Sequence, residues 1–282
     1  MSSNLKFCKM HGCGNDFIMV NGFCEQLPAD RGSLAEKLCD RHFGIGADGL
    51  ITLEPEAGYD FRMHIYQPDG SEAEMCGNGS RCAALFARQQ GICTASELNI
   101  ATLAGLIRPA ILESNETRGL VQVDMGAPRF AARTIPCTIP GDTVLEQPVE
   151  VSGREFIFSA VSMGNPHAVI FLNVPPQQFA VTTYGPLLEQ HEIFPAKVNV
   201  EFAQVQDKHT INMRVWERSV GETLACGTGA CACAVAAILT GRAEAPVTVK
   251  LAGGELQIAW EQGGSVFMTG PAEVSFFGEV KL

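Results

Sequence analysis

Two short segments of this chain place a cysteine where a helix could make it reactive. They read Cys76-Gly77-Asn78-Gly79 and Cys226-Gly227-Thr228-Gly229, and small or apolar residues follow each of them. A helix that begins after such a cysteine directs free backbone N–H groups and the positive end of its dipole at the sulfur. This environment favours a thiolate and binds anions. The sequence therefore predicts two reactive thiols, each beside donors suited to a carboxylate or a phosphate.

The two segments also agree in their flanking residues. Residues 70–87 and 221–237 both have Gly and Glu before the cysteine, and both predict helices after it, over about residues 80–90 and 230–239. The numbers of the two cysteines differ by 150, about half of the 282 residues. The pattern indicates an internal duplication, with one such element in each half.

Two thiols on opposite faces of one carbon suit the inversion of that carbon. One thiolate removes a proton, and the other thiol delivers a proton from the other side. Because an amino-acid α-proton is far less acidic than a thiol, whose pKa is ~8.5, the site must stabilise charge on the carboxylate with fixed N–H donors. No lysine has the surroundings of a Schiff base, so we expect no pyridoxal phosphate and no other cofactor. Cys231 and Cys233 alone are a poor zinc signal, so no metal is expected.

The composition narrows the class of protein. Lys and Arg number 20 against 31 Asp and Glu, which gives a net charge of −11 without any basic block. Nucleic acid and anionic membranes are therefore excluded as expected partners. No apolar run approaches the ~18–20 residues of a membrane span, and the first residues do not form a signal peptide. Eleven cysteines without a Cys-x-x-Cys pair predict free thiols in a reducing, cytoplasmic compartment.

Short strands and helices are expected around these segments. Residues 6–10 and 17–20 predict strands that flank a turn-rich loop, and residues 33–43 predict a helix capped by Ser33 and ended by Gly44. Residues 44–49 match Gly-x-Gly-x-x-Gly, but a helix precedes them and a strand follows. This order is the reverse of a dinucleotide-binding fingerprint.

Five motifs in register over nearly the whole chain resemble the diaminopimelate epimerase family. They are His11-Gly12-Cys13-Gly14-Asn15-Asp16-Phe17, Gly70-Ser71-Glu72 leading to Cys76, Met163-Gly164-Asn165-Pro166-His167, Glu217-Arg218 leading to Gly221-Glu222-Thr223, and the segment that begins at Cys226. The resemblance implies an α/β (α+β) fold of two pseudosymmetric domains, each a mainly antiparallel sheet wrapped around a central helix, with the active site in the cleft between them. The implied domains are residues 1–124 plus 271–282, with Cys76, and residues 125–270, with Cys226. It also implies a homodimer, with Phe276 where members often have an interface tyrosine.

The resemblance further implies an activity and the residues that perform it. The family interconverts LL- and meso-diaminopimelate in lysine and peptidoglycan precursor biosynthesis, without cofactor or metal. Cys76 and Cys226 are the implied catalytic thiols, the first as proton donor and the second as acceptor in one direction. His167 and Glu217 are implied to tune the pKa of the thiols. The implied substrate-binding residues are Asn15, Gln67, Gly77, Asn78, Asn165, Asn199, Glu217, Arg218, Gly227 and Thr228.

Other interpretations stay open at this point. The family commonly has Asn at the position of Gln67, where the distal end of the substrate binds. A related racemase for proline, hydroxyproline or histidine is therefore an alternative. A cysteine hydrolase with His167 as base needs only one thiol and leaves the repeated segment unexplained. A non-catalytic sensor would instead join Cys76 to Cys226 in a switchable disulfide. Structural roles are also open for Asn165 as a turn residue, Asn199 as a strand residue and Arg218 as the partner of Glu217 in a surface ion pair.

Overall fold

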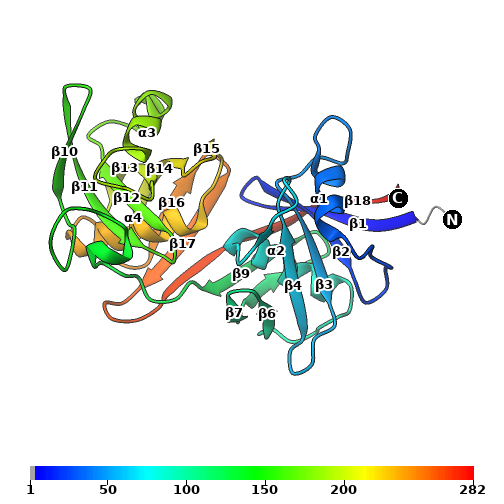
Figure 1. The fold of residues 1–282 in the computed structure, drawn as a ribbon. Helices are drawn as coiled ribbons and strands as arrows, with labels where there is room; N and C mark the ends of the chain where they lie inside the picture. Colours follow the sequence, from blue (N-terminus) through cyan, green and yellow to red (C-terminus); the bar gives the residue numbers. More distant parts are fainter. Residues whose placement is uncertain (1–3) are drawn as a thin grey trace. The chain divides into compact units, whose positions relative to one another are not determined.

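The computed structural model describes residues 4–282, which form two compact units (Figure 1). The first unit comprises the chain up to Asp124 together with Thr269–Leu282. The second unit comprises Met125–Met268. Each unit has its own core of strands and helices.

The first unit is built mainly from antiparallel strands. β1 pairs in an antiparallel manner with β2 and with the C-terminal strand β18, while β2 pairs in parallel with β3. The strands are β1 (Asn4–Gly12), β2 (Asn15–Asn21), β3 (Gly49–Glu54), β4 (Phe61–Tyr66), β5 (Glu72–Ala73), β6 (Ile100–Thr102), β7 (Gly105–Ile107), β8 (Ala110–Ser114), β9 (Arg118–Asp124) and most of β18 (Val266–Lys281).

Helix α2 (Gly77–Gln89) is the centre of this unit, and α1 (Arg31–Cys39) is its other helix. Every residue of α2 from Gly77 to Ala87 is buried, and the helix contacts β1, β2, β3, β8 and β9. A helix that is buried on all sides needs mostly small or apolar residues, which Ala, Leu and Phe supply here. Its buried Arg81 donates from Nε to the Pro271 carbonyl at 3.0 Å. Gly91, with φ of +69°, follows the end of the helix.

The second unit has the same plan around α4 (Gly227–Leu239). This helix contacts β11, β12, β13, β14, β16 and β17, and α3 (Val181–Glu189) lies against β13 and β14. Two short 3₁₀ turns complete the unit, Ala132–Thr134 and Pro176–Gln178. The strands are β10 (Gln147–Val151), β11 (Arg154–Ser162), β12 (Pro166–Phe171), β13 (Asn199–Asp207), β14 (Thr210–Glu217), β15 (Gly221–Thr223), β16 (Val247–Leu251) and β17 (Gly254–Trp260).

The predicted duplication is visible in the element boundaries. The bounds of β1 and β11, of α1 and α3, and of α2 and α4 each differ by 150 in residue number at both ends. Strand β2 pairs in parallel with β3, as β12 does with β13. The expected fold of two similar α/β units with mainly antiparallel strands is confirmed.

The prediction of a helix over residues 33–43 was wrong at both ends. Asp30, not Ser33, caps the helix, because its Oδ1 accepts a hydrogen bond from the Ser33 N–H at 2.9 Å. The helix ends at Cys39 because the Asp40 side chain accepts hydrogen bonds from the N–H groups of His42 and Phe43, both at 2.7 Å. An aspartate that binds the backbone ahead of it in this way competes with helix continuation.

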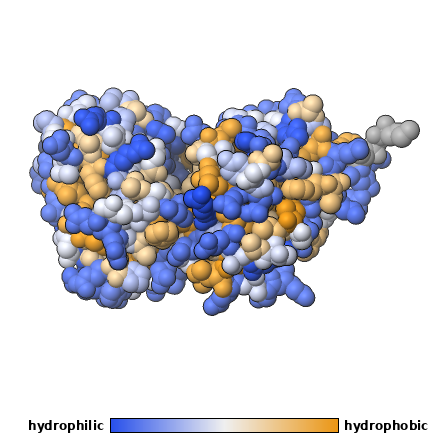
Figure 2. All heavy atoms as spheres, turned by 90° about the horizontal axis from the view of Figure 1, so that it is seen from below, coloured by the Kyte–Doolittle hydropathy of each residue, from blue (hydrophilic) through white to orange (hydrophobic). Residues whose placement is uncertain are grey.

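The surface is mixed in polarity. Figure 2 shows hydrophobic residues in small groups between hydrophilic ones on the face it presents. Among the large apolar side chains that are exposed are Phe43, Phe276 and Phe277. No helix within residues 4–282 has the length and apolar character needed to cross a membrane.

Candidate active site

Cys76 is the residue immediately before α2, and it caps that helix. Its backbone is extended, with φ −142° and ψ 118°. The half-buried sulfur lies 3.5 Å from the Gly79 nitrogen, whose N–H it accepts, and 3.7 Å from Asn15 Oδ1. The prediction that this cysteine stands at a helix start is confirmed, and a backbone donor of that helix reaches the sulfur.

Asn15, at the start of β2, has its side-chain amide held at both ends. Its Oδ1 accepts a hydrogen bond from Asn78 Nδ2 at 3.2 Å, and its Nδ2 donates to Asp48 Oδ2 at 2.8 Å. Arg41 in turn contacts Asp48 at 2.8 Å. Asp48 was not among the predicted site residues, because it is 33 residues away in sequence and becomes a neighbour only when β2 pairs with β3.

Gln67 follows β4 in an exposed turn. Its backbone N–H donates to the Ser71 carbonyl at 2.8 Å, and its own carbonyl accepts from the Gly70 N–H at 3.0 Å. The backbone of this turn is therefore fixed, while the Gln67 side chain is exposed. Its contact with the distal end of a substrate stays a prediction.

Cys226 occupies the N-cap position of α4, as Cys76 does in α2, but it is more deeply buried. Its backbone is also extended, with φ −122° and ψ 111°, and the residue is 5% exposed. Burial raises the pKa of the Cys226 thiol well above its usual range, and the negative charges of Glu217 and Glu201 raise it further. The Thr228 hydroxyl, 3.5 Å from the sulfur, acts in the opposite direction. In the free protein this thiol is therefore protonated.

Glu217, the last residue of β14, is hydrogen-bonded to Cys226. Burial raises the pKa of Glu217, while hydrogen bonds from Thr223 and Cys226 and the charge of His167 oppose that shift. The Thr223 hydroxyl donates to Glu217 Oε1. The Glu217 carboxylate is thus in contact with the Cys226 thiol, and its negative charge helps to hold the proton on the sulfur.

His167 is buried and belongs to a chain of hydrogen bonds that leads to the same cysteine. Its Nδ1 is 2.7 Å from Glu201 Oε1, and its Nε2 is 2.9 Å from Asn165 Oδ1. Asn165 Nδ2 donates in turn to Thr228 Oγ1 at 3.2 Å. Glu201 was missed at the sequence level. The available signal was a charged residue inside the otherwise uncharged, buried stretch of β13.

Asn199 and Arg218 are neighbours through the Arg218 backbone. Asn199 Oδ1 accepts from the Arg218 N–H at 2.9 Å, and Asn199 Nδ2 donates to the Pro166 carbonyl at 2.8 Å. The Arg218 side chain is exposed, and its Nη1 donates to the Ala196 carbonyl at 3.3 Å. No ion pair joins it to another residue of the described chain, so the surface ion pair with Glu217 is not formed. The guanidinium group is free to bind a carboxylate.

The second unit therefore gathers Asn165, His167, Glu217, Cys226 and Thr228 into one connected group, while the first unit gathers Asn15, Cys76 and Asn78. Within residues 4–282, no three His, Cys, Asp or Glu side chains are grouped so that they could hold a metal ion.

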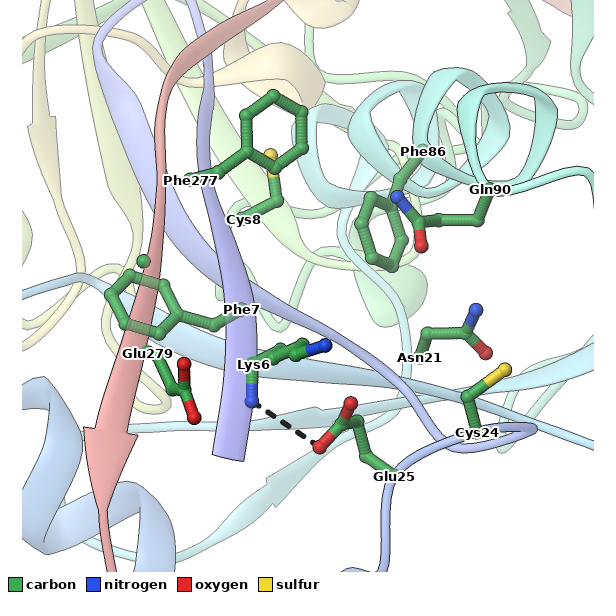
Figure 3. A pocket seen from close by; sticks show the side chains of 11 residues that line it. Lys6, Phe7, Cys8, Asn21, Cys24, Glu25, Phe86, Gln90, Phe277 and Glu279 are labelled. Carbon is green, nitrogen blue, oxygen red and sulfur yellow. Dashed lines mark hydrogen bonds between the residues drawn. The ribbon is translucent and has the colours of Figure 1, made fainter. Parts of the chain in front are cut away.

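A cavity of about 580 Å³ lies elsewhere in the first unit. Figure 3 shows Phe86 and Gln90, at the end of α2 opposite Cys76, facing Cys8 and Phe277 on the strands. The Lys6 N–H donates to Glu25 Oε2 at 3.2 Å along its wall. None of the predicted site residues lines this cavity.

Comparison with solved structures defines the class of protein. A phenazine biosynthesis protein of the PhzF family from Bacillus anthracis superposes with a TM-score of 0.73 at 14% identity, covering 99% of this chain and 100% of that one. A hydroxyproline epimerase from Agrobacterium vitis superposes with a TM-score of 0.66 at 17% identity, covering 99% and 93%. The chain thus has the two-unit fold shared by PhzF-type proteins and amino-acid epimerases.

Sequence comparison then identifies the family. The sequence matches the diaminopimelate epimerase family over residues 7–131 and 159–275. It is 51% identical over 276 residues to a diaminopimelate epimerase of Desulforudis audaxviator, covering 98% of this chain and 99% of that protein. It is 50% identical over 280 residues to one of Moorella thermoacetica, covering 99% and 100%. The chain belongs to the diaminopimelate epimerase family and is an isomerase.

Proposed function

We propose that the protein interconverts LL- and meso-diaminopimelate by exchanging protons at one α-carbon through Cys76 and Cys226, as a step of lysine and peptidoglycan precursor biosynthesis. Family membership supports the substrate. The observation that carries the mechanism is that each cysteine caps a buried helix, and that the two helices are equivalent elements of the duplicated fold. Each of the two helix starts thereby supplies one thiol and one set of backbone N–H donors.

The proposed chemistry needs one base and one acid. The thiolate of one cysteine takes the α-proton, and the electron pair of the broken C–H bond moves toward the carboxylate. The other thiol then gives its proton to the opposite face, and a new C–H bond forms with inverted configuration. The reaction returns each sulfur in the opposite protonation state, so the next turnover in reverse exchanges their roles.

Backbone donors stabilise the charge that develops on the reacting carboxylate. The N–H groups at Gly77 and Asn78 and at Gly227 and Thr228 belong to the first turns of their helices, where they have no partner within the helix. Such fixed donors stabilise an anionic transition state without reorganising.

Glu217 tunes Cys226, because its negative charge raises the pKa of that thiol. Because the Cys226 thiol is protonated in the free protein, it is ready to act as the acid. Once it has given that proton to the substrate, it is the thiolate that acts as the base in the reverse direction.

The remaining predicted residues hold the polar groups of the substrate in this proposal. Arg218, with its exposed guanidinium, binds a carboxylate. Asn15, Asn78, Asn165 and Asn199 contact the polar groups near the reacting carbon and along the chain of the substrate. The longer amide of Gln67 reaches the distal end.

We further propose a cytoplasmic homodimer. No disulfide joins the eleven cysteines, all of which lie within the described residues, and this suits a reducing compartment. Phe276 and Phe277 of β18 are 49% and 60% exposed, so this strand presents aromatic surface to a second copy of the chain. Size-exclusion chromatography with light scattering should give twice the mass of the chain. The variant Phe277→Glu should shift the protein toward the monomer.

The deciding experiment follows the α-proton in D2O. The reduced protein is mixed with LL-diaminopimelate, without added cofactor, and proton NMR with chiral analysis follows signal loss and the meso product. Parallel samples contain proline, hydroxyproline or histidine. Exchange and epimerisation of diaminopimelate alone are expected. Exchange with another amino acid instead would indicate a related racemase, and no exchange with any of them would overturn the proposal.

A further inference from the structure

Glu201 is a fully buried carboxyl group that the proposed chemistry does not use. It belongs to β13, and its side chain has no exposed area. Removing a charge from water is expensive unless partners compensate for it. Its Oε2 has no hydrogen-bond partner among the described residues, while its Oε1 lies 2.7 Å from His167 Nδ1. Such a residue calls for an explanation other than packing.

The duplicated fold shows that packing alone does not require a carboxylate here. A Cβ on Gly79 in α2 would meet Ile51 Cδ1 at 2.9 Å, and a Cβ on Gly229 in α4 would meet Glu201 Oε1 at 2.7 Å. Phe17 likewise takes the place of His167, since β2 pairs with β3 at Phe17 and Gly49, and β12 pairs with β13 at His167 and Asn199. The same backbone arrangement thus places the apolar pair Phe17 and Ile51 beside the first helix start. It places the polar pair His167 and Glu201 beside the second.

Glu201 is close to the cysteine both directly and through its partners. The position of a Cβ on Gly229 is 2.7 Å from Glu201 Oε1 and 3.3 Å from Cys226 Sγ. The absence of a side chain at Gly229 is what lets the carboxylate approach the sulfur. Through the other route, four hydrogen-bonded contacts connect Glu201 to the sulfur by way of His167, Asn165 and Thr228.

The chain of hydrogen bonds has a direction. Asn165 donates with Nδ2 to Thr228, so its Oδ1 accepts a hydrogen bond from the N–H at His167 Nε2. Thr228 accepts from Asn165 and therefore has its own hydroxyl proton available for Cys226 Sγ. Every hydrogen bond of the chain is therefore donated in the direction of the sulfur. The last of these donors can stabilise a thiolate once it forms. Glu201, bonded to His167 Nδ1, fixes the ring that begins this chain.

We propose that Glu201 is a positioning residue for Cys226. It holds His167 and the hydrogen-bond chain toward the sulfur, and its negative charge keeps the proton on Cys226 until the substrate is bound. The kinetic part of this inference rests on the proposed function. The inference makes the two thiols chemically unlike, although they cap equivalent helices.

The groups that face Cys226 and Glu201 define what a titration would report. They are His167 on β12, Glu217 on β14 and Cys233 on α4. The charge of Glu201 raises the pKa of Cys226 and of Cys233, and it also raises that of Glu217. Neutralising Glu201 should therefore lower the pH at which Cys226 ionises.

The test uses Glu201→Gln, which removes the charge and preserves the shape. The rate at which iodoacetamide alkylates each cysteine is measured against pH, with peptides separated by mass spectrometry. We expect the midpoint for Cys226 to fall by about one pH unit, while Cys76 in the same molecule stays unchanged. Glu189→Gln removes another buried, hydrogen-bonded carboxylate of the second unit and should leave the Cys226 midpoint where it is.

Activity gives a second readout. Glu201→Gln should reduce kcat/KM at least about tenfold and move the alkaline limb of its pH profile to lower pH. The double variant His167→Phe with Glu201→Ile copies the apolar pair of the first unit. It should fold with an unchanged circular dichroism spectrum and lose activity likewise.

An unmoved or raised Cys226 midpoint in folded Glu201→Gln, or an equal shift at Cys76, would overturn the inference. Alkylation needs no turnover. If the wild-type protein lacked epimerase activity, the proposed function would be overturned, and the alkylation test of Glu201 would still apply.

Discussion

Glu201 and Ile51 occupy equivalent positions beneath the two helix-capping cysteines. Each is the side chain nearest to the second glycine of its helix, Glu201 Oε1 at 2.7 Å and Ile51 Cδ1 at 2.9 Å from the Cβ that an alanine would introduce there. The duplication therefore repeats the backbone and the cysteine, but the side chains packed beside the helix start differ in chemical type. Apolar side chains lie beside the helix start at Cys76, whereas a buried carboxyl group and a histidine lie beside the helix start at Cys226.

Both cysteines should be individually required. Cys76→Ser and Cys226→Ser should each lower kcat/KM at least about 100-fold, because a serine hydroxyl is too weak an acid and its alkoxide forms too rarely to replace a thiol. The measurement is epimerisation of LL-diaminopimelate under reducing conditions. Cys24→Ser, at an exposed cysteine that lines the cavity near the C-terminal end of α2, is the control and should retain activity. Full activity in either catalytic variant would favour the one-thiol hydrolase instead.

Gly229 should tolerate alanine poorly. An alanine Cβ would approach Glu201 Oε1 to 2.7 Å, so Gly229→Ala should lower the free energy of unfolding by about 1–3 kcal/mol. Urea denaturation measures the change. Gly264→Ala is the control, since its Cβ meets nothing closer than the Glu261 carbonyl at 3.4 Å. Should the loss persist undiminished in a Glu201→Ala background, the close approach to Glu201 is not its cause.

Asp16 should make stability fall at low pH. Burial acts to raise the pKa of Asp16, but hydrogen bonds from Arg41 and Lys9 and their charges outweigh it and lower the pKa from 3.8 to about 2. A depressed pKa contributes stability above the unfolded value, and this contribution is lost as pH falls from about 4 through 2.

Asp16→Asn should therefore cost about 2 kcal/mol at pH 7, and the difference from wild type should shrink below pH 4. Urea titrations at several pH values would show this. Asp142→Asn, in an exposed loop, should leave the pH dependence unchanged. A constant difference between Asp16→Asn and wild type down to pH 2 would contradict the assignment.

Gln67 should affect binding more than chemistry. Loss of a hydrogen bond to a charged group of the substrate weakens binding by about 1.5–3 kcal/mol, so Gln67→Ala should raise KM at least about tenfold with a smaller change in kcat. Steady-state kinetics separate the two constants. Gln90→Ala, at the other end of α2, is the control. Equal KM values for both variants would remove Gln67 from the substrate site.

The helix starts at the two cysteines were predictable from the sequence because their determinants are contiguous. Cys-Gly-x-Gly followed by small apolar residues specifies a cap, a first turn and a buried helix within about fifteen positions, and the number difference of 150 exposed the duplication. The start of α1 was not predictable in this way, because Asp30 and Ser33 are both good capping residues. Only the hydrogen bond from the Ser33 N–H to Asp30 selects between them.

The sequence by itself determined the family, the two thiols and the repeated plan, since each is written in residues that are neighbours along the chain. The tertiary structure decided which side chains surround those thiols. Asp48 reaches Asn15 across 33 residues and Glu201 reaches His167 across 34, both through the parallel pairing of neighbouring strands. Such contacts depend on register and burial, which arise only when distant segments pack together.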